Sequence, residues 1–227
     1  MTAQVDHLVV AARSLAEGVA WCEATLGITP GPGGEHTLFG THNRLFSVAS
    51  AQFARAYFEV IAVNPGATPE GRHPGKRWFD LDDDSLRLAI AQGPSLVHFV
   101  VSTPDLVKAR AALHALGIDR GPALHASRMT ARGSLEWQIT VRPDGQRLCK
   151  GTLPTLIQWG GVHPADAMPD SGVRLKAMGA NHPQVDVLER AYAAIGLAGV
   201  EAVPGSTQLW AELDTPRGLV RLVSAGI

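Results

Sequence analysis

The chain has 227 residues, of which 45% are hydrophobic and 18% charged, and its formal net charge is −1. This balance is typical of a globular protein with a sizeable core, and the dispersed Lys and Arg argue against a nucleic-acid or membrane-surface partner. No uninterrupted apolar segment reaches the roughly 18 residues of a membrane-spanning helix. The first residues resemble no secretory signal, and Cys22 and Cys149 lie outside any CxxC motif. We therefore expect a cytoplasmic protein.

The N-terminal part predicts a strand, a helix and three more strands. The apolar, β-branched run at 5–11 is typical of a buried strand. Ser14 and Glu17 form a capping-box pattern at the start of a helix, and Gly27 is a natural residue to end it. Further strands are expected at residues 35–39, 44–50 and 56–63.

Residues 66–95 predict a connection that contains one helix. The run Asp80-Leu81-Asp82-Asp83-Asp84 offers either a metal site or a solvated helix start, with carboxylates near the positive end of the helix dipole. We favour the helix start.

The order β-α-β-β-β then repeats. A strand is expected at 95–101, and Thr103-Pro104 opens a helix with proline in its first turn, which ends at Gly117. Strands follow near residues 122–128, 134–142 and 153–159. Such internal similarity indicates a duplicated unit.

A fainter third copy occupies the C-terminal part. It combines a strand at 173–178, a helix at 183–195 that begins after Asn181, and strands near 200–203, 207–213 and 218–223. Residues 161–172 are the expected linker, and His163 within it is expected to be solvated. A lone unit would expose an apolar sheet face. This face either packs on the main body or forms a homodimer, and we favour the homodimer.

Four polar residues interrupt otherwise apolar strands. His7 and His98 lie in the first strand of the first two units, and Glu59 and Gln158 lie in the last strands. A buried titratable side chain needs a partner, because its burial alone is costly. Period-two alternation places Tyr57 and Glu59 on one face of their strand, and Leu156 and Gln158 on one face of theirs.

With these residues the duplication resembles the vicinal oxygen chelate superfamily, and within it the glyoxalase-like domain family. The local resemblance rests on Asp6-His7-Leu8-Val9, Gly40-Thr41-His42-Asn43, Tyr57-Phe58-Glu59-Val60-Ile61 and Leu156-Ile157-Gln158-Trp159-Gly160. It implies an α+β fold in which tandem βαβββ modules form curved mixed sheets around a central cavity. The expected division is a paired domain at 1–165 (modules 1–66 and 95–162, connection 67–94) and a C-terminal βαβββ-like unit at 172–227.

The resemblance also implies a divalent metal ion between the two modules. His7, Glu59 and His98 match ligand positions of the superfamily, and Gln158 stands at the fourth, where a carboxylate is more usual. These donors suit Zn²⁺, Ni²⁺, Mn²⁺ or Fe²⁺. The two histidines with Glu59 also compose a triad of the kind that binds non-haem Fe(II). Ligand types alone do not choose among these metals.

Further residues are candidates for substrate binding. His42 and Asn43 either shape the cavity mouth through turn hydrogen bonds or contact the ligand. Arg128, like Arg132, offers bidentate pairing to a carboxylate or phosphate, although solvated arginines are the favoured alternative. Trp78, Phe79 and Tyr57 are candidates for an apolar wall, although core packing is the favoured alternative. Trp137 is a further candidate for substrate binding. The sequence does not say which face of strand 134–142 lines the cavity.

Two functions follow. The first is a metal-dependent enzyme that chelates two oxygens of a small substrate and stabilises an oxyanion, with Glu59 as the base, in isomerase, lyase or dioxygenase chemistry. The second is a metal-free protein that binds or sequesters a small molecule, like the bleomycin-resistance proteins. The amide of Gln158 favours the second function, because it is a weaker ligand than a carboxylate.

Overall fold

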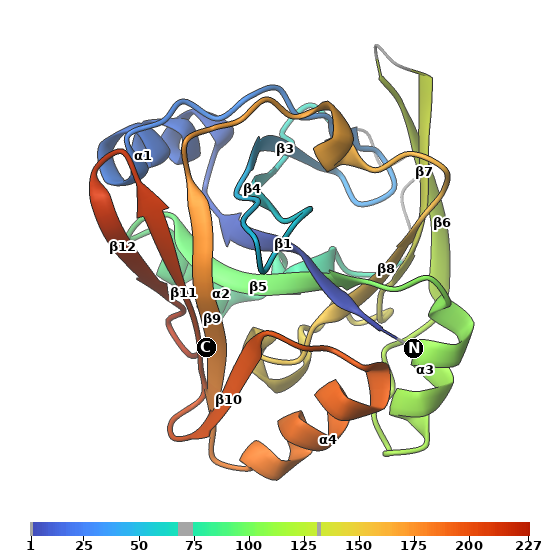
Figure 1. Cartoon of the computed structure of the whole chain (residues 1–227). Coiled ribbons are helices and arrows are strands. Elements are labelled where there is room, and N and C mark those ends of the chain that lie inside the picture. The colour runs from blue at the N-terminus through green and yellow to red at the C-terminus, as the bar shows by residue number, and fades with distance from the viewer. Residues whose placement is uncertain (1, 68–74, 131–132) are drawn as a thin grey trace.

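The computed structural model describes residues 2–67, 75–130 and 133–227. Its elements follow the β-α-β-β-β order three times (Figure 1). The first unit contains β1 (Gln4–Ala11), α1 (Leu15–Leu26), β2 (Glu35–His36), β3 (Thr41–Ser47) and β4 (Tyr57–Val63). The second contains β5 (Ser95–Ser102), α3 (Leu106–His114), β6 (Ala123–Thr130), β7 (Gly133–Thr140) and β8 (Thr155–Trp159). The third contains β9 (Arg174–His182), α4 (Val185–Ile195), β10 (Val200–Pro204), β11 (Gln208–Thr215) and β12 (Gly218–Val223).

The first two units share one curved, eight-stranded sheet. Its strand order is β2-β3-β4-β1-β5-β8-β7-β6, so the halves mirror each other across the antiparallel β1–β5 pair. In each half the first strand runs parallel to the last, as β1 does to β4 and β5 to β8. The predicted tandem βαβββ fold is confirmed.

The third unit has the same element order but a different strand pairing. Its sheet follows the order β10-β9-β11-β12, with β9 parallel to β10 and antiparallel to β11. The last strand, β12, therefore lies at an edge, whereas β4 and β8 lie beside the first strand of their units. The repeat is preserved in sequence order more than in sheet topology.

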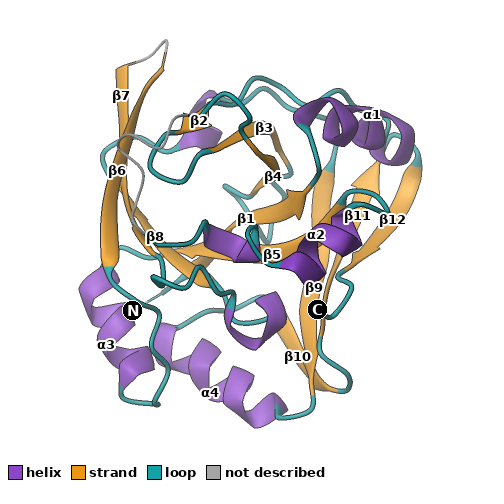
Figure 2. Cartoon of the chain, turned by 180° about the vertical axis from the view of Figure 1, so that it is seen from behind, coloured by secondary structure: helices purple, strands orange, loops and turns teal. Residues whose placement is uncertain are grey.

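The third unit packs against the outer face of the large sheet. One core cluster joins Leu8 and Phe99 of the large sheet to Leu209 and Leu213 of the small one. Helices α3 and α4 lie side by side at the edge of this contact (Figure 2). The chain itself thus covers the apolar face for which we expected a homodimer, which removes the reason for that expectation. The domain division at 165 and 172 stays a prediction.

The predicted helix starts are partly correct. Ser14 caps α1 by accepting a hydrogen bond from the Glu17 amide at 3.2 Å, but the Glu17 carboxylate binds Arg13 instead of closing the capping box. Gly27 ends α1 in the left-handed region with φ 75°. For α3 the N-cap is Asp105, so Pro104 precedes the helix.

Further features of the sequence can be compared with the structure. Asn181 belongs to β9, and α4 begins after Gln184. The aspartates of the connection lie around η1 (Trp78–Asp80) and α2 (Asp84–Ile90), where Asp83 caps α2. Asp80 and Asp82 form ion pairs with arginines, at 2.9 Å and 2.5 Å, and both cysteines are free thiols. No helix in the described part of the chain combines the length and apolarity needed to cross a membrane.

Replacing Tyr192 by Phe tests the docking of the third unit. The buried Tyr192 hydroxyl donates a 2.6 Å hydrogen bond to the Thr152 carbonyl, which connects α4 to the second unit. We expect Tyr192→Phe to lower the free energy of unfolding in urea by about 1–2 kcal/mol, because the carbonyl loses its donor in a buried place. Leu219→Ala, at a side chain that is 62% exposed on β12, is the control and should change it by less than about 0.5 kcal/mol. Equal effects of the two substitutions would contradict the prediction.

Candidate functional site

A small pocket with polar side chains on its floor and mostly apolar walls lies on the concave face of the large sheet. Its floor carries His7 of β1 with Tyr57 and Glu59 of β4, because parallel pairing sets His7 beside Tyr57 and Val9 beside Glu59. All three polar side chains are at most 5% exposed. The predicted common face of Tyr57 and Glu59 therefore lines a pocket.

A β-bulge in β1 brings two adjacent side chains into one network. The β1–β5 register shifts between Val5 and His7, which leaves Asp6 as the extra residue. Neighbouring residues of a regular strand point to opposite faces, and a bulge re-aims one of them. As a result the Asp6 carboxylate lies 2.7 Å from His7 Nδ1, while His7 Nε2 lies 3.5 Å from Glu59 Oε2.

Asp6 is the hub of this network. Its Oδ2 accepts hydrogen bonds from Trp159 Nε1 and His163 Nε2, both at 2.9 Å. Burial alone would raise the pKa of Asp6, but the hydrogen bonds and charges of His163 and His7 outweigh it and hold the pKa well below its ordinary value. Asp6 is therefore ionised at neutral pH. His163, which we expected to be solvated, is 5% exposed and connects the 162–171 segment to the floor.

Glu59 is held by a second set of contacts. Asn43 Nδ2 donates to Glu59 Oε1 at 2.6 Å, and His36 Nε2 lies 4.0 Å from the same oxygen. Burial, with the charges of Arg128 and His7 as smaller causes, lowers the pKa of His36 to about 3, so this ring is neutral at pH 7. Asn43 is thus placed at the site.

Tyr57 stacks on His7 with ring centroids 4.5 Å apart and an interplanar angle of 22°. Burial, followed by the charges of Asp6 and Glu59, raises the pKa of Tyr57 well above its ordinary value. The phenol therefore stays protonated and fixes the orientation of the imidazole.

Arg128 lies at the mouth of the pocket. It is paired with Leu135 across the β6–β7 hairpin, and its Nη1 is buried with no hydrogen-bond partner among the described residues. A Cβ on Gly34 would lie only 2.2 Å from this nitrogen, so Gly34 leaves room for the guanidinium. Trp137 lines the same pocket, which shows that the face of β7 with Leu135 and Trp137 is the inner one. Arg132 lies outside the described residues.

His98 is committed to structural hydrogen bonds. It is fully buried, and Nδ1 donates to the Gly151 carbonyl at 3.0 Å. Burial, then the charges of Arg120 and Arg147, lowers the pKa of His98 well below its ordinary value, so the ring is neutral. Its remaining lone pair, on Nε2, accepts from the Thr155 amide at 3.2 Å and faces the Thr155 hydroxyl at 3.0 Å. No lone pair is left for a metal ion.

Gln158 lies on the other face of its strand. Its Oε1 accepts a 2.8 Å hydrogen bond from the Leu106 amide at the start of α3, while Ile157 and Trp159 line the pocket. The common face of Leu156 and Gln158, expected from alternation, is therefore the outer face. His42 likewise belongs to the face of β3 opposite Asn43, and it does not line the pocket.

The residues present do not fit the metal site that the superfamily resemblance implies. Of the four predicted ligands, only His7 and Glu59 face each other in the pocket, since His98 and Gln158 bind backbone groups elsewhere. Across residues 2–67, 75–130 and 133–227, no three His, Cys, Asp or Glu side chains are arranged to hold an ion. The geometry supports an acid–base cluster instead.

Asp6, His36 and His163 are the site residues that sequence reasoning missed. In the sequence Asp6 belongs only to the Asp6-His7-Leu8-Val9 motif, and regular alternation would direct its side chain away from that of His7. His36 and His163 lie in a two-residue strand and in a linker, where periodicity carries no signal. Only a three-dimensional arrangement could reveal their partners.

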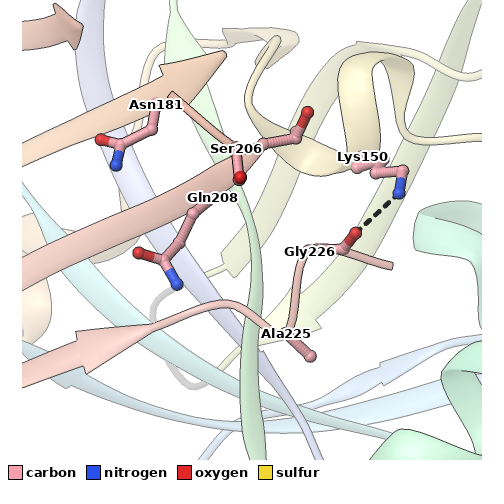
Figure 3. A pocket seen from close by; sticks show the side chains of 7 residues that line it. Lys150, Asn181, Ser206, Gln208, Ala225 and Gly226 are labelled. Carbon is pink, nitrogen blue, oxygen red and sulfur yellow. Dashed lines mark hydrogen bonds between the residues drawn. The ribbon is translucent and has the colours of Figure 1, made fainter. Parts of the chain in front are cut away.

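A separate hollow lies on the C-terminal unit, between the strand ends and the C-terminal segment (Figure 3). Of the described residues that line it, Lys150 alone carries a charge, and its ammonium already donates to the Gly226 carbonyl at 2.8 Å. Its other polar lining groups are amides and hydroxyls, so it offers no comparable chemistry.

Comparison with known proteins agrees with this architecture. A model of the family described as "Glyoxalase-like domain" matches residues 5–196. The chain belongs to the glyoxalase-like domain family. This confirms the resemblance to the vicinal oxygen chelate superfamily. The match extends through α4, beyond the residues 5–165 that carry the sequence motifs.

Solved structures that are similar to this chain have low sequence identity to it. A hypothetical protein from Staphylococcus aureus is similar over 97% of this chain and 85% of its own, with 15% identity and a TM-score of 0.57. Methylmalonyl-CoA epimerase from Streptomyces coelicolor is 16% identical over 72% of this chain and 99% of its own, with a TM-score of 0.45. A mutant of 4-hydroxymandelate synthase from the same organism is 12% identical over 98% of this chain and 62% of its own, with a TM-score of 0.45. Among curated proteins, no sequence matches this chain.

The Asp6 hub predicts a pH-dependent contribution to stability. Asp6→Asn removes the charge that His7 and His163 bind, so we expect the free energy of unfolding at neutral pH to fall by about 2–4 kcal/mol. Because the folded-state pKa is depressed, the wild-type advantage is fully present above the unfolded pKa of about 3.9 and is lost as pH falls below it. Urea unfolding of both proteins at about pH 7, 5 and 3 measures this. An advantage of the same size at all three pH values would contradict the assignment.

Proposed function

We propose that this protein binds a small oxygen-rich anion, and that Glu59 and His7 remove a proton from this ligand and return it without a bound metal ion. The observation that carries the proposal is the buried Glu59 carboxylate, 3.5 Å from His7 Nε2, in a small pocket beside the Arg128 guanidinium. Family membership supports the class of small-molecule site, and the assignment of the reaction rests on the residues of this chain.

Arg128 supplies the binding of the anion. A buried guanidinium nitrogen without a partner is costly unless a ligand satisfies it. Arginine pairs with carboxylates in a two-bond geometry that fixes orientation as well as charge. A carboxylate bound there would hold the neighbouring carbon atoms of the ligand over the pocket floor.

Glu59, His7 and Asp6 supply the proton transfer. Asp6 accepts a hydrogen bond from His7 Nδ1, so the other ring nitrogen, Nε2, faces Glu59 and the pocket. A carboxylate can take a proton from a carbon next to a carbonyl group, and the adjacent imidazole can then take up or return that proton. Such a step begins many isomerase and lyase reactions. The charge on Asp6 stabilises the imidazolium that this transfer creates, as buried carboxylates do beside catalytic histidines.

A binding protein without turnover is the second candidate. Asn43 donates a 2.6 Å hydrogen bond to Glu59 Oε1, so one oxygen of the carboxylate is already engaged with the protein. This contact favours holding a ligand over abstracting its proton. The proton-exchange measurement described next separates the two candidates.

Proton transfer is measurable as hydrogen–deuterium exchange. In D₂O we expect the wild type to accelerate exchange of the C3 protons of 2-oxobutanoate, followed by NMR, because this molecule has a carboxylate for Arg128 and acidic C–H bonds beside a carbonyl. Glu59→Gln should slow exchange at least about a hundredfold, the scale of one general base. Arg128→Met should mainly raise KM. The control is Glu136→Gln, at an exposed position of β7. Saturable binding without exchange above the buffer rate would leave the binding protein as the function.

Metal independence is tested by His98. We expect EDTA to leave the exchange rate unchanged, and we expect His98→Gln to lower the free energy of unfolding by about 1–3 kcal/mol while changing neither metal content nor exchange. His7→Gln serves as the comparison, since it should slow exchange. Elemental analysis that finds one metal ion per chain, lost in both variants, would show that the two histidines share an ion after all.

A further inference from the structure

The small pocket that contains Glu59 opens into a second, larger cavity. The inner pocket has a volume of about 30 Å³, room for little more than one water molecule. The outer cleft measures about 1060 Å³, at the upper end of the range for drug-sized ligands. The residues that line both are Leu45, Arg128, Leu135 and Pro164. A ligand that reaches the inner pocket therefore leaves most of its body in the outer cleft.

The walls of the outer cleft are largely apolar. They come from the 28–37 segment, the β6–β7 hairpin and the 162–171 segment. Met129 on β6 is 79% exposed, and Val162 on the 162–171 segment is 47% exposed. Exposed apolar side chains gathered around a cleft are typical of a ligand-binding groove.

The cleft is preformed, because its 162–171 wall is fixed near both ends. His163 binds the Asp6 hub at 2.9 Å, and Ser171 donates to the Ser47 carbonyl. Between them Asp166 pairs with Arg55 at 2.5 Å. A preformed cleft binds its ligand with little ordering cost.

The charges along the cleft suit a ligand with a single negative group. Arg128 is the only lysine or arginine among the described residues that line it. Glu35 and Asp170 add negative charge, and Asp170 is already paired with Arg174 at 2.6 Å. A nucleotide or another polyphosphate would meet one cation and two carboxylates, which disfavours it.

We infer that the ligand is an amphipathic monocarboxylate, whose carboxylate binds Arg128 at the junction and whose acyl or aryl body lies in the outer cleft. This inference rests on the proposed function and names its substrate class. The inner pocket then receives only the carbon atoms next to the carboxylate, which are those that Glu59 reaches.

Saturated carboxylates test the ligand class separately from the reaction, because they lack the ketone carbonyl that makes the neighbouring C–H protons exchangeable. By calorimetry we expect decanoate, below its micelle concentration, to bind at least about tenfold tighter than hexanoate, since one fully buried CH₂ strengthens binding up to about fourfold. Acetate should bind weakest. Arg128→Met should weaken decanoate at least about tenfold, as expected for a charged pair, and leave decan-1-ol unchanged.

A matched pair of variants locates the chain of the ligand. Ala167→Trp places an indole in the cleft from an exposed position, and Ala111→Trp does the same on the exposed side of α3, away from the cleft. We expect only Ala167→Trp to weaken decanoate, by about tenfold or more, with acetate unaffected. If that variant does not fold, Ser127→Trp on β6 fills the cleft from its other wall.

Affinity that is independent of chain length, equal binding of decanoate and decan-1-ol, or equal effects of the two tryptophan variants would overturn the inference. Glu59→Gln should retain decanoate binding. If the chain-length series holds while 2-oxobutanoate shows no exchange, the ligand class stands and proton transfer fails. If exchange occurs while decanoate binds no better than acetate, proton transfer stands and the ligand class fails.

Discussion

The buried Asp6 carboxylate is the interaction on which the site depends. It binds His7 on its own strand, Trp159 on β8 and His163 on the 162–171 segment, so one charge connects both halves of the sheet and one wall of the cleft. An ionised group can be buried only when its oxygens are satisfied. These three nitrogens satisfy it and, in doing so, set the orientation of the imidazole that faces Glu59.

The sequence predicted the fold well because periodicity and helix ends are local signals. Apolar runs marked β1 and β5, and Gly27 marked the end of α1 through its left-handed backbone. The site was harder to predict. The bulge at Asp6 breaks the alternation that sequence reasoning relies on, and the partner of His163 lies 157 residues away in the chain.

The four metal ligands were predicted from the superfamily resemblance, and the surroundings of His98 and Gln158 do not support them. Alternation had already placed Gln158 with Leu156, and the structure shows that this face packs outward, where the amide caps α3. His98 occupies a superfamily ligand position, yet Thr155 and Gly151 use both of its nitrogens. The two halves thus share a topology without sharing a chemistry. In the second half, His98 lies inside a buried polar cluster, in which Arg120 donates a 2.5 Å hydrogen bond to the Thr155 hydroxyl. Burial lowers the pKa of Arg120 to about 10.

The docking of the third unit has a consequence for motion. Because the small sheet and the helices cover its outer face, β1 is buried on both faces and lies between β4 and β5. Backbone hydrogen bonds in such a strand open only with extensive unfolding, whereas edge strands open locally. His7 therefore stands on one of the least mobile parts of the molecule, and Arg128 stands on β6, at the sheet edge. The reacting groups keep a fixed geometry, and Arg128, which selects the ligand, belongs to an edge strand with a neighbour on one side only, so ligand preference can diverge among relatives without disturbing the floor.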